Sequence, residues 1–136
     1  MTANPIAVIF YVNNLGVTTM NYIDGYVLAV PTANREAYTK LSMGMALCFK
    51  KYGALSTVEN WGDDVPEGKL TSFTMAVKRE ETESIVFSWI NWPSRTVRDE
   101  AWKLIMQDPV MQDENYSKLF DGKRMIFGGF QTILEV

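Results

Sequence analysis

Two acidic residues are the first candidates for chemistry in this sequence. Asp24 lies within the otherwise apolar segment YIDGYVLAV (22–30), and Glu59 lies in a second strand-like segment, ALSTVENW (54–61). A carboxylate in a mostly apolar strand must find a partner or titrate abnormally, and such groups often act as acids or bases. If the protein is an enzyme, we therefore expect Asp24 or Glu59 to transfer a proton.

Basic residues form a second candidate group. Lys123 and Arg124 follow a turn in the segment FDGKRM, where two cations can hold an anionic ligand, and Arg98 is a third cation for this role. Each has a structural alternative. Lys123 and Arg124 can be solvated at the entry to a strand or pair with Asp24, and Arg98 and Asp99 can form intrahelical or interstrand ion pairs.

An acidic turn and a set of aromatic residues complete the predicted binding residues. Asp63 and Asp64 lie in a turn whose carboxylates suit a hard cation, but the spacing does not match an EF-hand loop and we predict no metal. Aromatic side chains can line a pocket for a planar ligand, or they can be core or dimer interface. That aromatic set is Trp61, Trp89, Trp92, Trp102, Tyr22 and Tyr26. The predicted ligand contacts are Trp61, Asp63, Asp64, Trp89, Arg98, Lys123 and Arg124.

Composition excludes several classes of function. The sequence contains no histidine and one cysteine, which excludes Ser-His-Asp and Cys-His nucleophiles, an internal disulfide and a thiolate zinc cage. Cys48, in an apolar helical segment, is predicted to be a buried thiol. The formal charge of −3 argues against a nucleic-acid or anionic-membrane surface. We expect no cofactor, and we expect a cytoplasmic protein because the apolar run 6–12 is too short to cross a bilayer.

Hydrophobic periodicity predicts two β-α-β units that position these residues. The first contains a strand over 22–30, a helix capped by Thr32 or Asn34 and ending near Tyr52, and a strand over 54–61. The second contains a strand at 84–92, a helix capped by Ser94, a helical turn with a loop at 109–120, and a last strand over 123–135. Residues 70–77 form either a strand or an irregular segment. Gly128 and Gly129 mark either a bulge or a close backbone approach.

This order predicts an α+β domain over residues 20–136, with residues 1–19 as an extension or an extra edge strand. Two β-α-β halves indicate a ferredoxin-like split β-α-β subunit, in which an antiparallel sheet carries two helices on one face. The other face would expose roughly eight large apolar side chains, each contributing about 1.5–3 kcal/mol when buried. The same face of a second copy is the simplest cover, so we predict a homodimer.

Four ordered motifs also carry a family resemblance: YIDGYVLAVP at 22–31, ENWGDDVPEGK at 59–69, FSWINWPSRTVRD at 87–99 and FDGKRMIFGGF at 120–130. Over about residues 20–135 the chain closely resembles the YbaA-like family of small bacterial proteins of unknown function. The resemblance implies a ferredoxin-like subunit of the dimeric α/β-barrel kind. Asn60, where relatives often have Cys, and residues 117–119, where a proline-containing segment is usual, depart from the family pattern.

The family has no established reaction, so the resemblance gives no catalytic roles. We expect a homodimer that binds a small molecule between sheet and helices, with no nucleic-acid or membrane partner. One alternative is a non-catalytic structural, interaction or stress-associated dimer. A second alternative is an enzyme similar in fold to cofactor-free monooxygenases and small isomerases, although fold alone does not determine function.

Overall fold

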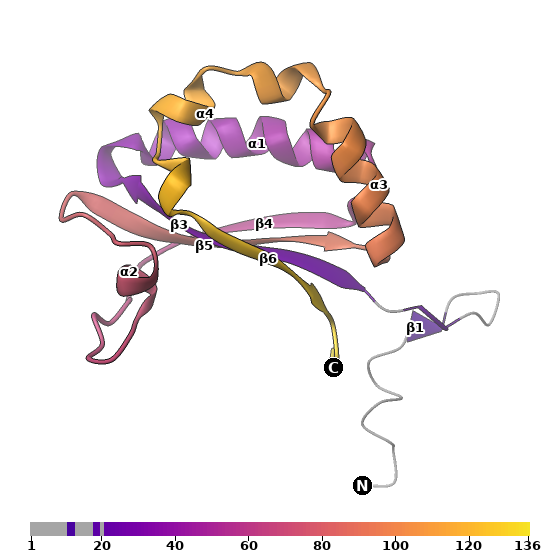
Figure 1. Ribbon diagram of the computed structural model, residues 1–136, viewed down its shortest axis with the longest axis horizontal. Coiled ribbons are helices and arrows are strands. Elements are labelled where there is room, and N and C mark those ends of the chain that lie inside the picture. Colours follow the sequence, from indigo (N-terminus) through magenta and orange to yellow (C-terminus); the bar gives the residue numbers. More distant parts are fainter. Residues whose placement is uncertain (1–10, 13–17, 20) are drawn as a thin grey trace, which may run out of the picture.

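A computed structural model describes residues 11–12, 18–19 and 21–136 of the chain (Figure 1). Two short strands, β1 (Tyr11–Val12) and β2 (Thr18–Thr19), pair with each other and do not join the main sheet. The rest of the extension predicted at residues 1–19 lies outside the described residues. The family-like part of the chain begins with the first long strand, at Tyr22.

Four antiparallel strands form the main sheet. They are β3 (Tyr22–Pro31), β4 (Ser56–Trp61), β5 (Glu83–Trp92) and β6 (Ile126–Gln131), in the spatial order β4-β5-β3-β6. The prediction of an α+β fold with an antiparallel sheet is confirmed. The last strand is shorter than the predicted 123–135, because residues 122–124 form a 3₁₀ turn before it.

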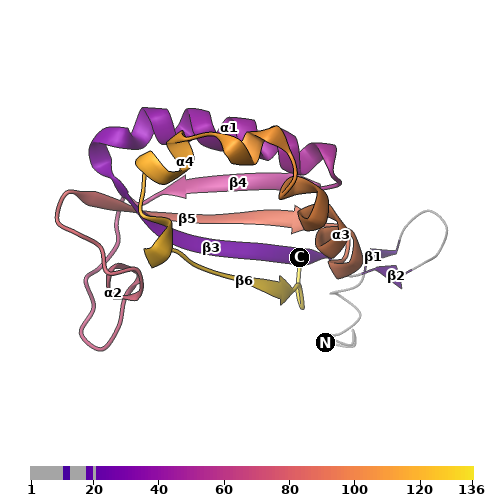
Figure 2. The same ribbon diagram turned by 45° about the horizontal axis from the view of Figure 1, so that its top comes forward.

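Two long helices cover one face of this sheet (Figures 1 and 2). Helix α1 (Arg35–Lys51) connects β3 to β4, and α3 (Arg95–Ile105) leads from β5 toward β6. Each connection passes over one intervening strand, since β5 lies between β3 and β4 and β3 lies between β5 and β6. Both helices therefore bring their side chains to the same sheet face, which we call the inner face.

Helix ends agree only partly with the sequence prediction. Ser94 caps α3 as predicted, with its hydroxyl accepting a hydrogen bond from the Val97 backbone N–H at 3.1 Å. At the start of α1, a 3₁₀ turn (Thr32–Asn34) precedes the helix and the Asn34 side chain does not cap it. Asn34 instead donates to the Leu119 carbonyl at 3.0 Å, so the predicted cap tethers another part of the chain.

A segment from Met106 to Met125 crosses above the inner face between α3 and β6. It contains a 3₁₀ turn (Pro109–Gln112) and a one-turn helix, α4 (Asn115–Lys118), as the prediction of a helical turn with a loop required. Figure 2 shows it running alongside α1. Asp108 anchors its start to the end of α1, accepting from the Tyr52 hydroxyl at 2.8 Å and from the Lys51 ammonium at 3.4 Å.

The surroundings of Gly129 show why the last strand needs a glycine at this position. The register between β3 and β6 is continuous, with Asp24 opposite Gly129, so the pair does not mark a bulge. A Cβ at Gly129 would meet the Tyr22 hydroxyl and would lie 2.8 Å from the Arg98 guanidinium. The second predicted alternative, a close approach, is therefore confirmed, and the approaching groups are side chains.

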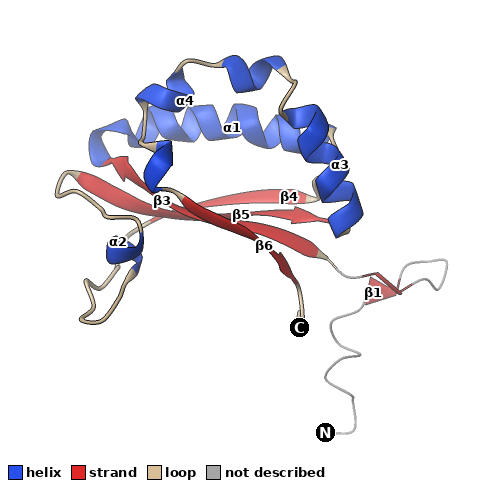
Figure 3. Ribbon diagram, viewed as in Figure 1, coloured by secondary structure: helices blue, strands red, loops and turns tan. Residues whose placement is uncertain are grey.

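The opposite, outer face of the sheet is only partly covered. A loop containing a short helix, α2 (Phe73–Ala76), lies beneath one end of the sheet (Figure 3). There Val77 packs with Val27 and Ile85, which resolves the ambiguous segment 70–77 as helix and loop. Farther along the same face, Phe87 and Phe130 remain 45% and 59% exposed. The outer face thus carries fewer bare apolar side chains than predicted, but it keeps an aromatic patch.

The expectation of a buried thiol in the core is confirmed. Cys48 is buried as predicted, and burial raises the pKa of its thiol. Within α1, Tyr38 is buried while Ala37 is exposed, so Tyr38 is the first residue of the buried face of this helix. In the described part of the chain, no helix combines the length and apolar character needed to cross a membrane.

Candidate functional site

A cavity of about 970 Å³ lies between the inner face of the sheet, the two long helices and the segment 106–125. Sheet residues such as Asp24 and Glu59 lie on its floor, α1 contributes Tyr38, and the crossing segment contributes Tyr116. Among the residues that the structure describes, seven aromatic residues and four methionines line it, which makes the wall largely apolar and adaptable in shape. The size and character are those of a small-molecule site.

Glu59 is the centre of a hydrogen-bonded cluster at the floor of this cavity. Its carboxylate accepts from the Tyr38 hydroxyl at 3.0 Å, from the Tyr26 hydroxyl at 3.2 Å and from the Ser88 hydroxyl. These four residues come from β4, α1, β3 and β5, so the cluster joins three strands and a helix. The register that places Glu59 opposite Ser88, and Ser88 opposite Tyr26, aligns them across the sheet.

The two tyrosines of this cluster are held as neutral hydrogen-bond donors. Burial first, and the charge of Glu59 second, raise the pKa of Tyr26 and of Tyr38 well above the usual range of a phenol. Burial likewise raises the pKa of Tyr116. Near neutral pH each hydroxyl therefore keeps its proton, and Tyr26 and Tyr38 direct theirs to Glu59.

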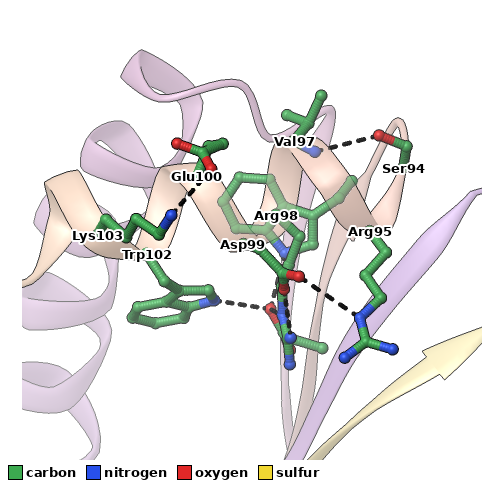
Figure 4. Close-up of polar contacts among 10 residues, drawn as sticks. Ser94, Arg95, Val97, Arg98, Asp99, Glu100, Trp102 and Lys103 are labelled. Carbon is green, nitrogen blue, oxygen red and sulfur yellow. Dashed lines mark hydrogen bonds and ion pairs between the residues drawn. The ribbon is translucent and has the colours of Figure 1, made fainter.

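Asp24 is the centre of a different cluster at the other side of the cavity floor. Its carboxylate accepts from Arg98 at 2.8 Å and 3.0 Å and from the indole N–H groups of Trp92 and Trp102 at 2.8 Å and 2.9 Å. Figure 4 shows Arg98 and Trp102 reaching from α3 toward the sheet. Arg98 also donates to Asp99 at 2.9 Å. The hydrogen bond to Asp24 raises the pKa of the Arg98 guanidinium further above its usual range.

One structural alternative from the sequence, a pairing of Asp24 with Lys123 or Arg124, is wrong, because Asp24 pairs with Arg98. The residue of β6 opposite Asp24 is Gly129, and Arg98 reaches over this glycine from α3. Arg124 pairs instead with the buried Glu83, both of its terminal nitrogens lying 2.7 Å from the two carboxylate oxygens. The hydrogen bonds from Arg124 hold the pKa of the Glu83 carboxyl below its usual range.

Comparisons with known proteins place the chain in a family. The profile described as "Protein of unknown function (DUF1428)" matches residues 21–122. The chain belongs to this family. Relatives named "Uncharacterized protein YbaA" from Escherichia coli strain K12 and from Shigella flexneri are each 52% identical over 116 residues, covering 85% of this chain and 99% of the relative. The resemblance predicted from four motifs is thus confirmed.

The fold brings together some of the predicted site residues of this family member. Asp24, Glu59, Arg98 and Lys123 all line the cavity. Among the described residues, Lys123 forms no ion pair, and its side chain lies at the exposed rim. Arg98 and Arg124 are both engaged by carboxylates of the protein itself.

The other predicted binding residues lie elsewhere. Trp61 packs against Tyr38, with ring centroids 6.3 Å apart, and lies behind the cavity wall. Asp63 and Asp64 are exposed in the turn after β4, and Trp89 lies on the outer face beside Phe87. Their predicted contact with a ligand remains a prediction, and it would not take place in this cavity.

Sequence reasoning missed Tyr38, Ser88 and Tyr116. Tyr38 precedes Leu41 and Met45 at helical spacing, so helical periodicity places it on the same face as these two residues. Ser88 is a lone small polar residue in an apolar strand, fully buried and aligned with Glu59 by the sheet register. Tyr116 carries no comparable signal, because its position depends on the path of the crossing segment.

Proposed function

We propose that this DUF1428 protein is a homodimer that binds a small, largely apolar molecule in the cavity between its sheet and helices. The single observation that carries the proposal is the cavity of about 970 Å³, whose largely apolar wall surrounds the Glu59 cluster on its floor. The cavity is lined by aromatic and methionine side chains, so the free energy falls when an apolar ligand replaces the water inside it.

A bulky side chain inside the cavity tests this proposal. Ser42 and Met43 are adjacent on α1, but Ser42 lines the cavity whereas Met43 is 62% exposed and does not line it. We expect wild type and Met43→Trp, purified from the native host, to carry a bound small-molecule mass in native mass spectrometry. Ser42→Trp should lose that mass. Equal occupancy in all three proteins would contradict binding in the cavity.

The dimer part of the proposal concerns the outer face. The strand order β4-β5-β3-β6 with two crossover helices on one face supports a ferredoxin-like subunit, and the exposed aromatic patch supports pairing of two sheets as in a dimeric α/β barrel. Phe130, which lies over Gly25 and Gly128, is central to this patch. A C2 contact would bury it against the same patch of the second copy.

Sedimentation analysis tests the dimer. Phe130→Glu should convert a dimer into a monomer, because it places two charges in an apolar contact. Leu47→Glu, at a 61% exposed position on α1, should leave the dimer intact. A monomeric wild type would overturn this part of the proposal.

The predicted cytoplasmic location is retained in the proposal. The single buried thiol suits a reducing compartment, and cell fractionation tests this location.

A second candidate function is cofactor-free acid–base catalysis in the same cavity. It is favoured by Glu59, a carboxylate held within hydrogen-bond reach of two phenols at the cavity floor. The engagement of Asp24, Arg98 and Arg124 within the protein instead favours a purely structural role for those three residues. Proton exchange from a bound ligand that is lost in Glu59→Gln but not in Asp24→Asn would favour the catalytic candidate.

A further inference from the structure

The Glu59 cluster presents acceptors, not donors, to whatever occupies the cavity. Each of Tyr26, Tyr38 and Ser88 has one hydroxyl proton, and all three protons are directed to the Glu59 carboxylate. A carboxylate has about four acceptor positions, and each phenol oxygen keeps lone pairs of its own. A ligand group that meets this cluster is therefore matched when it donates hydrogen bonds and mismatched when it only accepts them.

The charge of Glu59 is also uncompensated within the described part of the chain. The other three acidic residues that line the cavity each contact an arginine: Asp24 and Asp99 contact Arg98 at 2.8 Å and 2.9 Å, and Asp121 contacts Arg124 at 3.1 Å. Glu59 forms no ion pair with any described Lys or Arg, and its partners are hydroxyls. Glu59 is half-buried, and a carboxylate partly shielded from water without a cation is a place where a ligand cation adds binding free energy.

Two tyrosines contact Glu59, and further aromatic rings pack beside one of them. The ring of Phe120 lies 5.8 Å from that of Tyr38 and 6.3 Å from that of Tyr116, both at steep angles. Tyr26 and Tyr38 have their hydroxyls on Glu59. Rings grouped beside a carboxylate stabilise an ammonium group through their negative faces and exclude water from it.

We propose that the ligand of this cavity carries a protonated amine that docks on Glu59 among these tyrosines, with an apolar body against the methionines and aromatic residues. This inference rests on the proposed function and specifies its ligand class. It differs from the expectation of an anionic ligand, because Arg98 and Arg124 are already engaged by Asp24 and Glu83 and Lys123 lies at the exposed rim.

A matched set of probes with one apolar body and three head groups tests the ligand class. Diphenylpropylamine, diphenylpropanol and diphenylpropanoate are titrated into the full-length protein near neutral pH by calorimetry. The amine should bind about tenfold more tightly than the alcohol, the difference between a charge-assisted and a neutral hydrogen bond. The carboxylate should bind most weakly.

Variants test whether the preference for the amine probe depends on Glu59. Glu59→Gln should reduce the amine to the affinity of the alcohol while leaving alcohol binding within about twofold. The matched control Glu36→Gln, an exposed acid on α1 outside the cavity lining, should keep the preference. If Glu59→Gln does not fold, the comparison of the three probes on wild type still decides the question.

The possible outcomes separate the two proposals. Equal binding of the three probes, or tightest binding of the carboxylate, would overturn the amine assignment and leave the cavity as a binding site. An amine preference that survives in Glu59→Gln would also overturn it. Failure of all three probes to bind wild type would contradict both proposals.

Discussion

Asp24 and Glu59 stand on the same sheet face and line the same cavity, yet the protein treats their charges differently. Asp24 is paired with a guanidinium and two indole N–H groups, so its charge is neutralised within the fold. Glu59 accepts hydrogen bonds from three hydroxyls and forms no ion pair with any Lys or Arg that the structure describes. The first arrangement joins a helix to a strand, whereas the second leaves a carboxylate for a ligand.

The largest effect that separates the two clusters should come from removing the cation of the first. Arg98→Met leaves the 9% exposed Asp24 carboxylate with no charged partner, and breaking a buried ion pair costs about 3–5 kcal/mol. Glu59→Gln keeps the shape of its cluster and should cost about 1 kcal/mol. Urea denaturation measures both. A larger loss for Glu59→Gln would reverse the assigned roles.

A second test disturbs the Asp24 cluster without changing any charge. Gly129→Ala forces Arg98 and Tyr22 away from the strand and should cost about 1–3 kcal/mol, the usual range for overpacking. The control is Gly44→Ala, in α1, where a Cβ would meet nothing within 4 Å. It should stabilise the helix by about 0.5–1 kcal/mol. Thermal unfolding of both variants gives the comparison, and a neutral Gly129→Ala would mean that Arg98 has room to move.

A smaller effect is expected when Glu59 loses one hydroxyl. Tyr38→Phe removes a donor 3.0 Å from the carboxylate and should cost about 1 kcal/mol, the contribution of one hydrogen bond. It should also weaken binding of the amine probe severalfold, because the carboxylate is positioned less firmly. A loss of stability with unchanged probe affinity would assign the Glu59 cluster to the fold and remove its distinction from Asp24.

The smallest effect is a change in acid sensitivity at Glu83, a carboxylate that is buried and paired with an arginine, as Asp24 is. Its pKa is lowered by Arg124 in the folded protein, so its contribution to stability is present above the ordinary glutamate value of about 4.3 and is lost as pH falls through the folded pKa. Glu83→Gln should therefore flatten the fall in melting temperature below about pH 5. The exposed control Glu36→Gln should not, and an unchanged acid limb in Glu83→Gln would contradict the pairing.

The sequence predicted the frame of the site better than its contacts. Strand periodicity and the Ser94 cap identified real features because each depends on residues close together in the chain. The Gly128-Gly129 pair indicated a close approach, but the approaching side chains, Tyr22 and Arg98, are distant in sequence and were not predicted. The partner suggested for Asp24 as an alternative was wrong, because the true partner depends on where α3 crosses the sheet. Lys123 and Arg124 lie just before β6, the strand that pairs with the strand of Asp24. The 3₁₀ turn at 122–124 directs Arg124 to Glu83 instead.

The position of the cavity between sheet and helices agrees with the sequence prediction, but several of its lining residues were not predicted. A site between sheet and helices follows from two crossover helices on one face, and Glu59 was among its predicted acids. Tyr116 and Phe120 come from the segment 106–125, whose path is fixed by tethers such as Asp108 to Tyr52 and Asn34 to Leu119. These contacts join residues more than fifty positions apart, and no local pattern in the sequence encodes them.

Native mass spectrometry of wild type, Glu59→Gln and Asp24→Asn, each purified from the native host, tests the central claim most directly. The account predicts that wild type is a dimer with a bound small molecule, which fragmentation identifies as an amine. Glu59→Gln should lose this molecule and only about 1 kcal/mol of stability, whereas Asp24→Asn should keep the molecule and show the larger fall in melting temperature. The reverse pattern, with ligand lost from Asp24→Asn and retained by Glu59→Gln, would contradict the account.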